Sequence, residues 1–191
     1  RTLPNDIVRF STHLPIVKDD NDRWECEVKV NQALSELKRH GGGPVHINLT
    51  TMYGCDYSVK VLPEVRIIRR IFPNDVFPEL PKRRIGVFVG AHGKWKQEQI
   101  EMLDRFCAAH NAVVFCDHTS GYKGKYRVLY SLIASQDALA VDLNNLDLLV
   151  HIGEISGEYG CLRKLHPKCV WRVNEDGEMR DFFHCLQYVF E

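Results

Sequence analysis

The sequence predicts an α/β protein, a Rossmann-like parallel sheet with helices on both faces. Short and continuously apolar runs, such as RIGVFVG at 84–90 and LDLLVHIG at 146–153, are typical of strands that are buried on both faces. Amphipathic segments follow these runs, and loops that contain glycine or proline separate the two kinds of segment. This alternation indicates the crossover units of a parallel sheet.

The first predicted element is a helix within DNDRWECEVKVNQALSELKRHGG, residues 20–42. Asp22 and Glu25 have the spacing of a capping box, and Gly41 supplies the left-handed exit. Apolar residues recur at helical spacing, at Cys26, Val30, Ala33, Leu34 and Leu37. A tight loop then leads to a strand at Val45–Leu49. Helix, loop and strand are half of an α/β crossover, and we expect the partners of this strand upstream, outside the chain.

Residues 51–81 change character, with four prolines and one short β-like run at Val65–Ile71. This composition is typical of a linker. We therefore expect three parts: residues 1–50 as the end of one domain, 51–81 as an interdomain linker and 82–191 as a Rossmann-like domain.

Four strands are expected in the last part, at 84–90, AVVFC (112–116), 146–153 and CVWRV (169–173). A helix within 91–111 separates the first two strands. A second helix is expected to turn Leu129, Leu132 and Ile133 inward. A closing helix is expected from an apolar stripe that comprises Phe182, Phe183, Leu186, Val189 and Phe190.

The composition of the chain argues against several classes of function. Lys+Arg and Asp+Glu are both 25, and this balance gives no support to nucleic-acid binding. No apolar run has the length of about 20 residues that a membrane-spanning helix needs. The seven cysteines include no CxxC pair, so free thiols in a reducing cytoplasm are expected rather than disulfides. Cys161, His166 and Cys169 fit no common zinc spacing, and no metal site is expected.

Polar and glycine residues follow three of the predicted strands, at the sheet edge where ligands of such folds bind. The candidate binding residues are Gly90, Ala91, His92 and Gly93, then Asp117, His118 and Thr119, and finally Gly153 and Glu154. The glycine spacing is neither GxGxxG nor a Walker loop, so a plain tight turn is the alternative interpretation. Cys116 and His118 are not expected to form a catalytic dyad, and His151 is expected to be a hydrogen-bonded core residue.

GGGPVHINLTT, the proline-rich linker, and strands that end in FVGAHG, VVFCDHTSG and LLVHIGE together resemble the thiamine-diphosphate-dependent enzymes. These are the relatives of acetolactate synthase and the 2-oxo acid decarboxylases. The resemblance covers residues from about 24 to 191. It implies the end of a pyrimidine-binding domain followed by the central domain, a six-stranded parallel fold. It also implies a bacterial lyase or transferase that acts on a 2-oxo acid.

The resemblance implies that neither half of the catalytic machinery lies in this chain. The glutamate that contacts the pyrimidine ring is expected upstream, and NEDGE at 174–178 is not the GDG…N motif that holds magnesium and diphosphate. Thiamine diphosphate and magnesium are therefore expected in the intact parent enzyme and not in this fragment, which has no catalytic residues of its own. Its expected partners are its own pyrimidine- and diphosphate-binding domains, in a homodimer or tetramer.

Two other functions remain open at this point. In some relatives the central domain binds FAD or the ADP part of a coenzyme, so a nucleotide-binding module is one alternative. Here the acids Asp117 and Glu154 would repel a pyrophosphate, so bound FAD is not the expectation. A purely structural or oligomerising domain is the other alternative.

Overall fold

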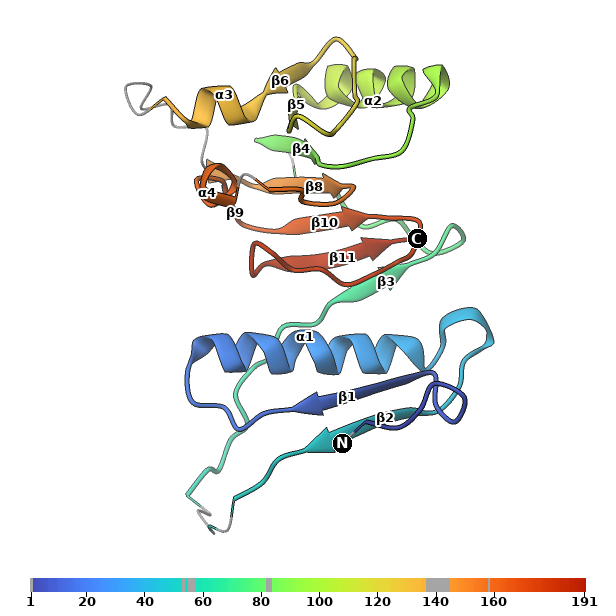
Figure 1. Cartoon of the computed structure of the whole chain (residues 1–191), viewed down its shortest axis with the longest axis vertical. Coiled ribbons are helices and arrows are strands. Elements are labelled where there is room, and N and C mark those ends of the chain that lie inside the picture. Colours follow the sequence, from blue (N-terminus) through green and yellow to red (C-terminus); the bar gives the residue numbers. More distant parts are fainter. Residues whose placement is uncertain (1, 53, 55–57, 82–83, 137–144, 158) are drawn as a thin grey trace. The chain divides into compact units, whose positions relative to one another are not determined.

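A computed structural model describes residues 2–52, 54, 58–81, 84–136, 145–157 and 159–191. The expected free thiol at Cys55 and the expected domain start at Lys82 lie outside these residues. The chain divides into two compact units, residues 1–70 and residues 71–191. Each unit is described by itself (Figure 1).

The first unit is a strand–helix–strand arrangement. Strand β1 (Phe10–Leu14) is followed by helix α1 (Asp20–Glu36), a short 3₁₀ helix η1 (Arg39–Gly41) and strand β2 (Val45–Leu49). β1 and β2 are parallel, and Phe10 lies opposite Val45. The strand at 45–49 is confirmed, but the expectation that its partner lies outside the chain is wrong. The partner, FSTHL, is short and follows a stretch without clear periodicity, so its apolar pattern alone did not reveal it.

Helix α1 begins two residues before the predicted cap. Asp19, in an extended conformation, is the N-cap, and its side chain accepts a hydrogen bond from the backbone N–H of Asp22. On the next turns, Asn31 donates its amide to the carbonyl of Arg66, at 2.9 Å, and accepts from the backbone N–H of Ile68, at 2.8 Å. The middle of the proline-rich segment is therefore fixed to α1 within this unit.

A sheet of seven strands organises the second unit, in the order β3-β11-β10-β8-β4-β5-β6. Its central strands β4 (Ile85–Val89), β5 (Val113–Cys116), β8 (Leu148–Ile152) and β10 (Val170–Val173) were predicted. Strand β3 (Arg69–Ile71) lies at the end of the β-like run expected at Val65–Ile71, and the additional strands are β6 (Arg127–Leu129) and β11 (Leu186–Phe190). All pairings from β11 to β6 are parallel. The Rossmann-like fold class is thus confirmed, with seven strands in place of six.

Smaller elements complete the second unit. They are the helices α2 (Gln97–His110), α3 (Tyr130–Ala134) and α4 (Tyr159–Leu162), and the paired strands β7 (Asn145–Leu146) and β9 (His166–Pro167). All five residues of β4 are buried, and Cys107 of α2 packs into the same core cluster. The inward orientation expected for Leu129 and Leu132 is wrong, because their side chains are 45% and 62% exposed.

The closing segment is a strand, so the predicted helix at this position is wrong. Leu186 and Val189 are both fully buried, three residues apart, which resembles helical spacing. The register of β11 on β10 shifts between Val170 and Trp171, which lie opposite Leu186 and Tyr188. One extra residue in a strand changes the face of every later side chain. This irregularity therefore produces a three-residue interval in an extended chain.

No helix in the described part of the chain is long and apolar enough to cross a bilayer. The six cysteines in this part are free thiols, and Cys107 and Cys116 are buried. Burial raises the pKa of the Cys107 thiol to about 11. Both side chains therefore behave as small apolar core residues.

Candidate functional site

The predicted binding residues gather at one edge of the sheet, where β4, β5 and β8 end. Val89 lies opposite Cys116 on one side and Ile152 on the other. The residues that follow these three positions therefore leave the sheet side by side. Because β4 comes first in the chain among these strands and lies between β5 and β8, this is the point at which strand order reverses and doubly wound folds bind their ligands.

The crevice at this point is closed by main-chain hydrogen bonds. Ala91 donates to the carbonyl of Glu154 at 2.6 Å, and Glu154 donates to the carbonyl of Ala91 at 2.9 Å. Gly90 donates to the carbonyl of Ile152 at 3.0 Å. These N–H groups would be the natural donors for a phosphate, but the protein itself satisfies them. We call this pairing of the two strand ends the latch.

Two glycines are required by the latch. A Cβ atom on Gly90 would lie 2.0 Å from the carbonyl oxygen of Glu154. Gly153 has a φ of +75°, and a Cβ atom there would lie 2.4 Å from the carbonyl oxygen of Ala91. These glycines therefore permit close approach between two parts of the backbone.

Asp117 connects the loops that follow β5 and β8. Its carboxylate accepts from the backbone N–H of Thr119 at 2.7 Å, from the Thr119 hydroxyl at 2.8 Å and from the Ser156 hydroxyl at 3.0 Å. Asp117 is 6% exposed. His118, by contrast, is exposed while Cys116 is buried, and burial raises the pKa of the Cys116 thiol. A reactive cysteine needs the thiolate form, so the two residues do not form a nucleophile–base pair.

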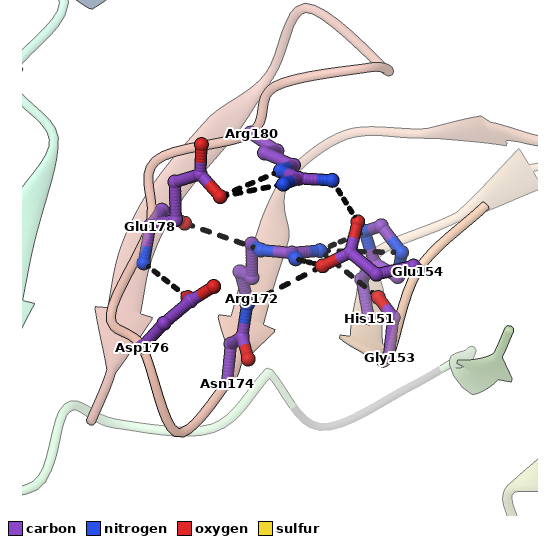
Figure 2. A network of polar contacts seen from close by, with 8 residues as sticks. All are labelled: His151, Gly153, Glu154, Arg172, Asn174, Asp176, Glu178 and Arg180. Carbon is purple, nitrogen blue, oxygen red and sulfur yellow. Dashed lines mark hydrogen bonds and ion pairs between the residues drawn. The ribbon is translucent and has the colours of Figure 1, made fainter. Parts of the chain in front are cut away.

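A polar network around Arg172, next to the latch, was not predicted from the sequence (Figure 2). Arg172 of β10 is fully buried. Its guanidinium donates to the Glu154 carboxylate at 2.5 Å, to the Gly153 carbonyl at 3.2 Å and to the Glu178 carbonyl at 3.2 Å. Arg180 pairs with the second carboxylate oxygen of Glu154 and with Glu178. A buried charge is tolerated when it is paired and hydrogen-bonded, so this network fixes the position of Glu154.

His151 belongs to the same network and is 2% exposed. Its ring lies 3.3 Å from the guanidinium of Arg172 and packs on Phe88 and Phe183. Burial, and then the positive charge of Arg172, lower the pKa of His151 to about 3. The imidazole is therefore neutral at neutral pH, and the prediction of a hydrogen-bonded core histidine is confirmed.

A separate cavity of about 900 Å³ opens beside the latch. Ala91, His92, Gly93, Gly153 and Glu154 contribute to its wall, whereas the other four candidate residues do not. The ring of His92 stacks on Trp95 with 4.3 Å between centroids. The remaining lining is mostly apolar and includes Phe106, Trp171 and Phe190.

The described residues offer little catalytic chemistry. No group of three His, Cys, Asp or Glu side chains in this part of the chain could hold a metal ion. Asp117 and Glu154 each use both carboxylate oxygens in contacts within the protein. The arrangement stabilises a closed sheet edge.

Comparison with known proteins identifies relatives along the entire chain. No protein-family model matches. The chain is 28% identical over its whole length to the 2-succinyl-5-enolpyruvyl-6-hydroxy-3-cyclohexene-1-carboxylate synthases of Bacteroides thetaiotaomicron and Phocaeicola vulgatus, and it covers 38% of each. The chain is a relative of these synthases. Against the synthase of Bacteroides fragilis the identity is 26%, over 96% of this chain and 36% of that protein.

The comparisons confirm the resemblance to thiamine-diphosphate-dependent enzymes. Within that family, the segments GPVHIN at 43–48 and VWRVNEDGEMRD at 170–181 most resemble the synthase. The chain spans less than two-fifths of the length of these relatives. Its similarity therefore concerns one part of a synthase.

Proposed function

We propose that this chain is a non-catalytic central part of a longer thiamine-diphosphate-dependent enzyme, a lyase or transferase that acts on a 2-oxo acid. One observation carries the proposal: the whole chain aligns with synthases of which it covers only 38%. The intact parent would hold thiamine diphosphate and magnesium in its other domains, as a homodimer or tetramer. Free thiols at the six described cysteines agree with a cytoplasmic location.

The contacts of the NEDGE segment support the view that it is not a magnesium–diphosphate site. Asn174, Asp176 and Glu178 form a tight turn after β10: Asp176 accepts from the backbone N–H of Glu178 at 2.8 Å, and the N–H of Gly177 donates to the carbonyl of Asn174 at 3.1 Å. Asn174 also contacts Glu154. Asp176 is thus engaged within the turn, and the Glu178 carboxylate pairs with Arg180. No catalytic step is therefore assigned to residues of this chain.

The closed crevice supports a structural role over a nucleotide-binding one. A pyrophosphate on the loop after β4 would have to replace the two hydrogen bonds between Ala91 and Glu154. It would also lie close to the Glu154 and Asp117 carboxylates, which repel an anion. Occupation of this edge by FAD or ADP stays a prediction of the alternative function, and absorbance released at 260 or 450 nm on denaturation (roughly the adenine and flavin bands) would reveal it.

The test of the proposal is a turnover measurement on two proteins. The purified 191-residue chain is incubated with thiamine diphosphate, Mg²⁺ and either pyruvate or 2-oxoglutarate, and carbon dioxide release is followed. The product of the complete coding sequence is assayed in parallel. We expect turnover by the longer protein alone. Carbon dioxide release by the 191-residue chain above the rate without protein would overturn the non-catalytic assignment.

A further inference from the structure

One face of the sheet in the second unit is apolar over a wider area than its long helix covers. The side chains of Val87, Val150, Trp171 and Phe190 come from four neighbouring strands, β4, β8, β10 and β11, and belong to a single core cluster. Helix α2 lies beside β4 and β5 (Figure 1) and contributes Cys107 to that cluster. Strands of a parallel sheet are normally covered on both faces. Phe77 packs on Trp171 and Phe190, and Trp171 is buried, but Val173 at the end of β10 is 38% exposed, so the cover is incomplete at the carboxyl end of this strand.

Val150, Trp171 and Phe190 of this face form the floor of the cavity of about 900 Å³. Met102 and Phe106 of α2 also line the cavity, as do Phe77 and Leu80. Met102 is 58% exposed and Phe77 is 60% exposed. Contiguous exposed apolar side chains of this kind mark an interaction surface. We call it the α2 groove.

The α2 groove has the properties of a binding site for a helix. Gln99, Met102, Leu103 and Phe106 have the spacing i, i+3, i+4 and i+7, which places them on one stripe of α2. Neighbouring helices pack side by side along such stripes, with axes about 8–10 Å apart. Because α2 presents an apolar stripe to the groove, a second helix next to it would bury both that stripe and the floor.

The charged residues at the edges of the α2 groove indicate which charges a bound helix would carry on its two sides. Lys94 and Lys96 line the side next to α2, whereas Glu175 and Glu191 line the side at the ends of β10 and β11. A helix with acidic residues toward α2 and basic residues on the other flank would therefore fit.

We propose that the α2 groove is the docking site of an amphipathic helix from the remainder of the same, longer polypeptide. This inference rests on the proposed function, since it requires that the chain be part of a larger enzyme. The relatives extend far beyond the part that this chain matches. Glu191, which follows β11, lines the groove. A helix in cis also avoids the entropic cost of binding a separate partner.

Hydrogen exchange provides the test. Exchange of the backbone amides in 99–106 and 171–175 is compared between the 191-residue chain and the product of the complete coding sequence. We expect exchange to be slower in the longer protein by about tenfold or more, because packing suppresses local opening. A matched pair of variants, Met102→Glu in the groove and Leu132→Glu on exposed α3, is made in the longer protein. Only Met102→Glu should remove the added protection and lower the thermal midpoint.

Each outcome decides the proposal. Equal exchange rates in the two proteins, or equal effects of the two variants, would overturn it. Protection in the 191-residue chain that rises with its concentration, together with a dimer in sedimentation, would assign the groove to a second copy. A small molecule released on denaturation of that chain would assign it to a ligand. Turnover by the longer protein without added protection would remove only this inference and leave the proposed function intact. Added protection without turnover would remove the proposed function and leave this inference intact.

Discussion

The guanidinium of Arg172 donates to the imidazole of His151 across neighbouring strands, with 3.3 Å between Nη1 and Nδ1. The two residues lie directly opposite each other in the pairing of β10 with β8. Both side chains are buried. A positive charge at this distance opposes protonation of the imidazole, so the histidine acts as a neutral acceptor for the arginine. Because of this pair, the stability of the sheet should depend on pH.

Acid should destabilise the second unit at a pH where carboxylates are still ionised. The pKa of His151 is lowered to about 3 in the folded protein, against about 6.5 when unfolded. Between these values the unfolded state binds more protons, so stability is complete above about pH 6.5 and falls as the pH decreases. The slope reaches about 1.4 kcal/mol per pH unit. Urea unfolding at pH 7, 6 and 5 measures how the unfolding free energy depends on pH, with His151→Gln as the control.

His151→Gln keeps an acceptor for Arg172 and removes the titrating group. We therefore expect a flatter dependence of the unfolding free energy on pH in this variant, whatever its absolute stability. Equal slopes for the variant and the parent chain would mean that His151 is not held neutral by burial.

Removal of the Glu154 carboxylate should be destabilising. In Glu154→Ala the buried guanidinium of Arg172 loses its only side-chain carboxylate among the described contacts. Breaking a buried ion pair costs about 3–5 kcal/mol, and we expect about 2 kcal/mol here because the Glu154 side chain is 38% exposed. Glu178→Ala removes a carboxylate that pairs with the half-exposed Arg180 and should cost less than about 1 kcal/mol. Similar losses for both variants in urea unfolding would contradict this difference.

Gly90 and Gly93 provide a direct test of the latch. A Cβ atom on Gly90 would overlap the carbonyl oxygen of Glu154, whereas one on Gly93 meets nothing within 4 Å. Gly90→Ala should therefore displace the latch and destabilise the protein by about 1–3 kcal/mol, the usual cost of an overpacked site. Gly93→Ala should be neutral or slightly stabilising. Thermal unfolding of the two variants measures the contrast, and an unaffected Gly90→Ala would mean that the two strand ends are not paired.

Asn31 should be the main polar link between α1 and residues 66–68 of the proline-rich segment. Asn31→Ala removes the side-chain amide that forms hydrogen bonds with the backbone of Arg66 and Ile68. Leaving such groups without a partner costs about 1–3 kcal/mol. Faster hydrogen exchange at the Ile68 amide, with unchanged exchange in β4, is the expected signature. Exposed Leu34 on the same helix offers a control in Leu34→Ala, which should leave the Ile68 amide unaffected.

The central strands could be predicted because buried parallel strands have a direct signature in sequence. IGVFV at 85–89 is apolar throughout, and all five residues are buried. Two elements could not be predicted in this way. FSTHL of β1 mixes polar and apolar residues and is stabilised by its pairing with β2. In β11 the register shift opposite Val170 imposes a three-residue interval on the buried side chains, and this depends on the neighbouring strand.

The location of the candidate residues could be predicted, but their chemical state could not. Parallel strands bring Gly90, Asp117 and Gly153 to one edge, because consecutive strand ends must meet there. Whether that edge is open depends on the pairing of Ala91 with Glu154, 63 positions further along the chain. Arg172, which fixes Glu154, lies in a run that reads as an ordinary buried strand. Local sequence patterns contain no information about such long-range contacts.

The latch also has an evolutionary consequence. Its bonds join main-chain atoms of Ala91 and Glu154, which every amino acid except proline can supply, so these bonds should survive extensive divergence of the side chains. Only Gly90 and Gly153, which allow the two backbones to approach, are constrained in identity. In descendants of this sheet, recovery of an open crevice would need a change in the main chain, such as an insertion, and gradual replacement of side chains would not suffice.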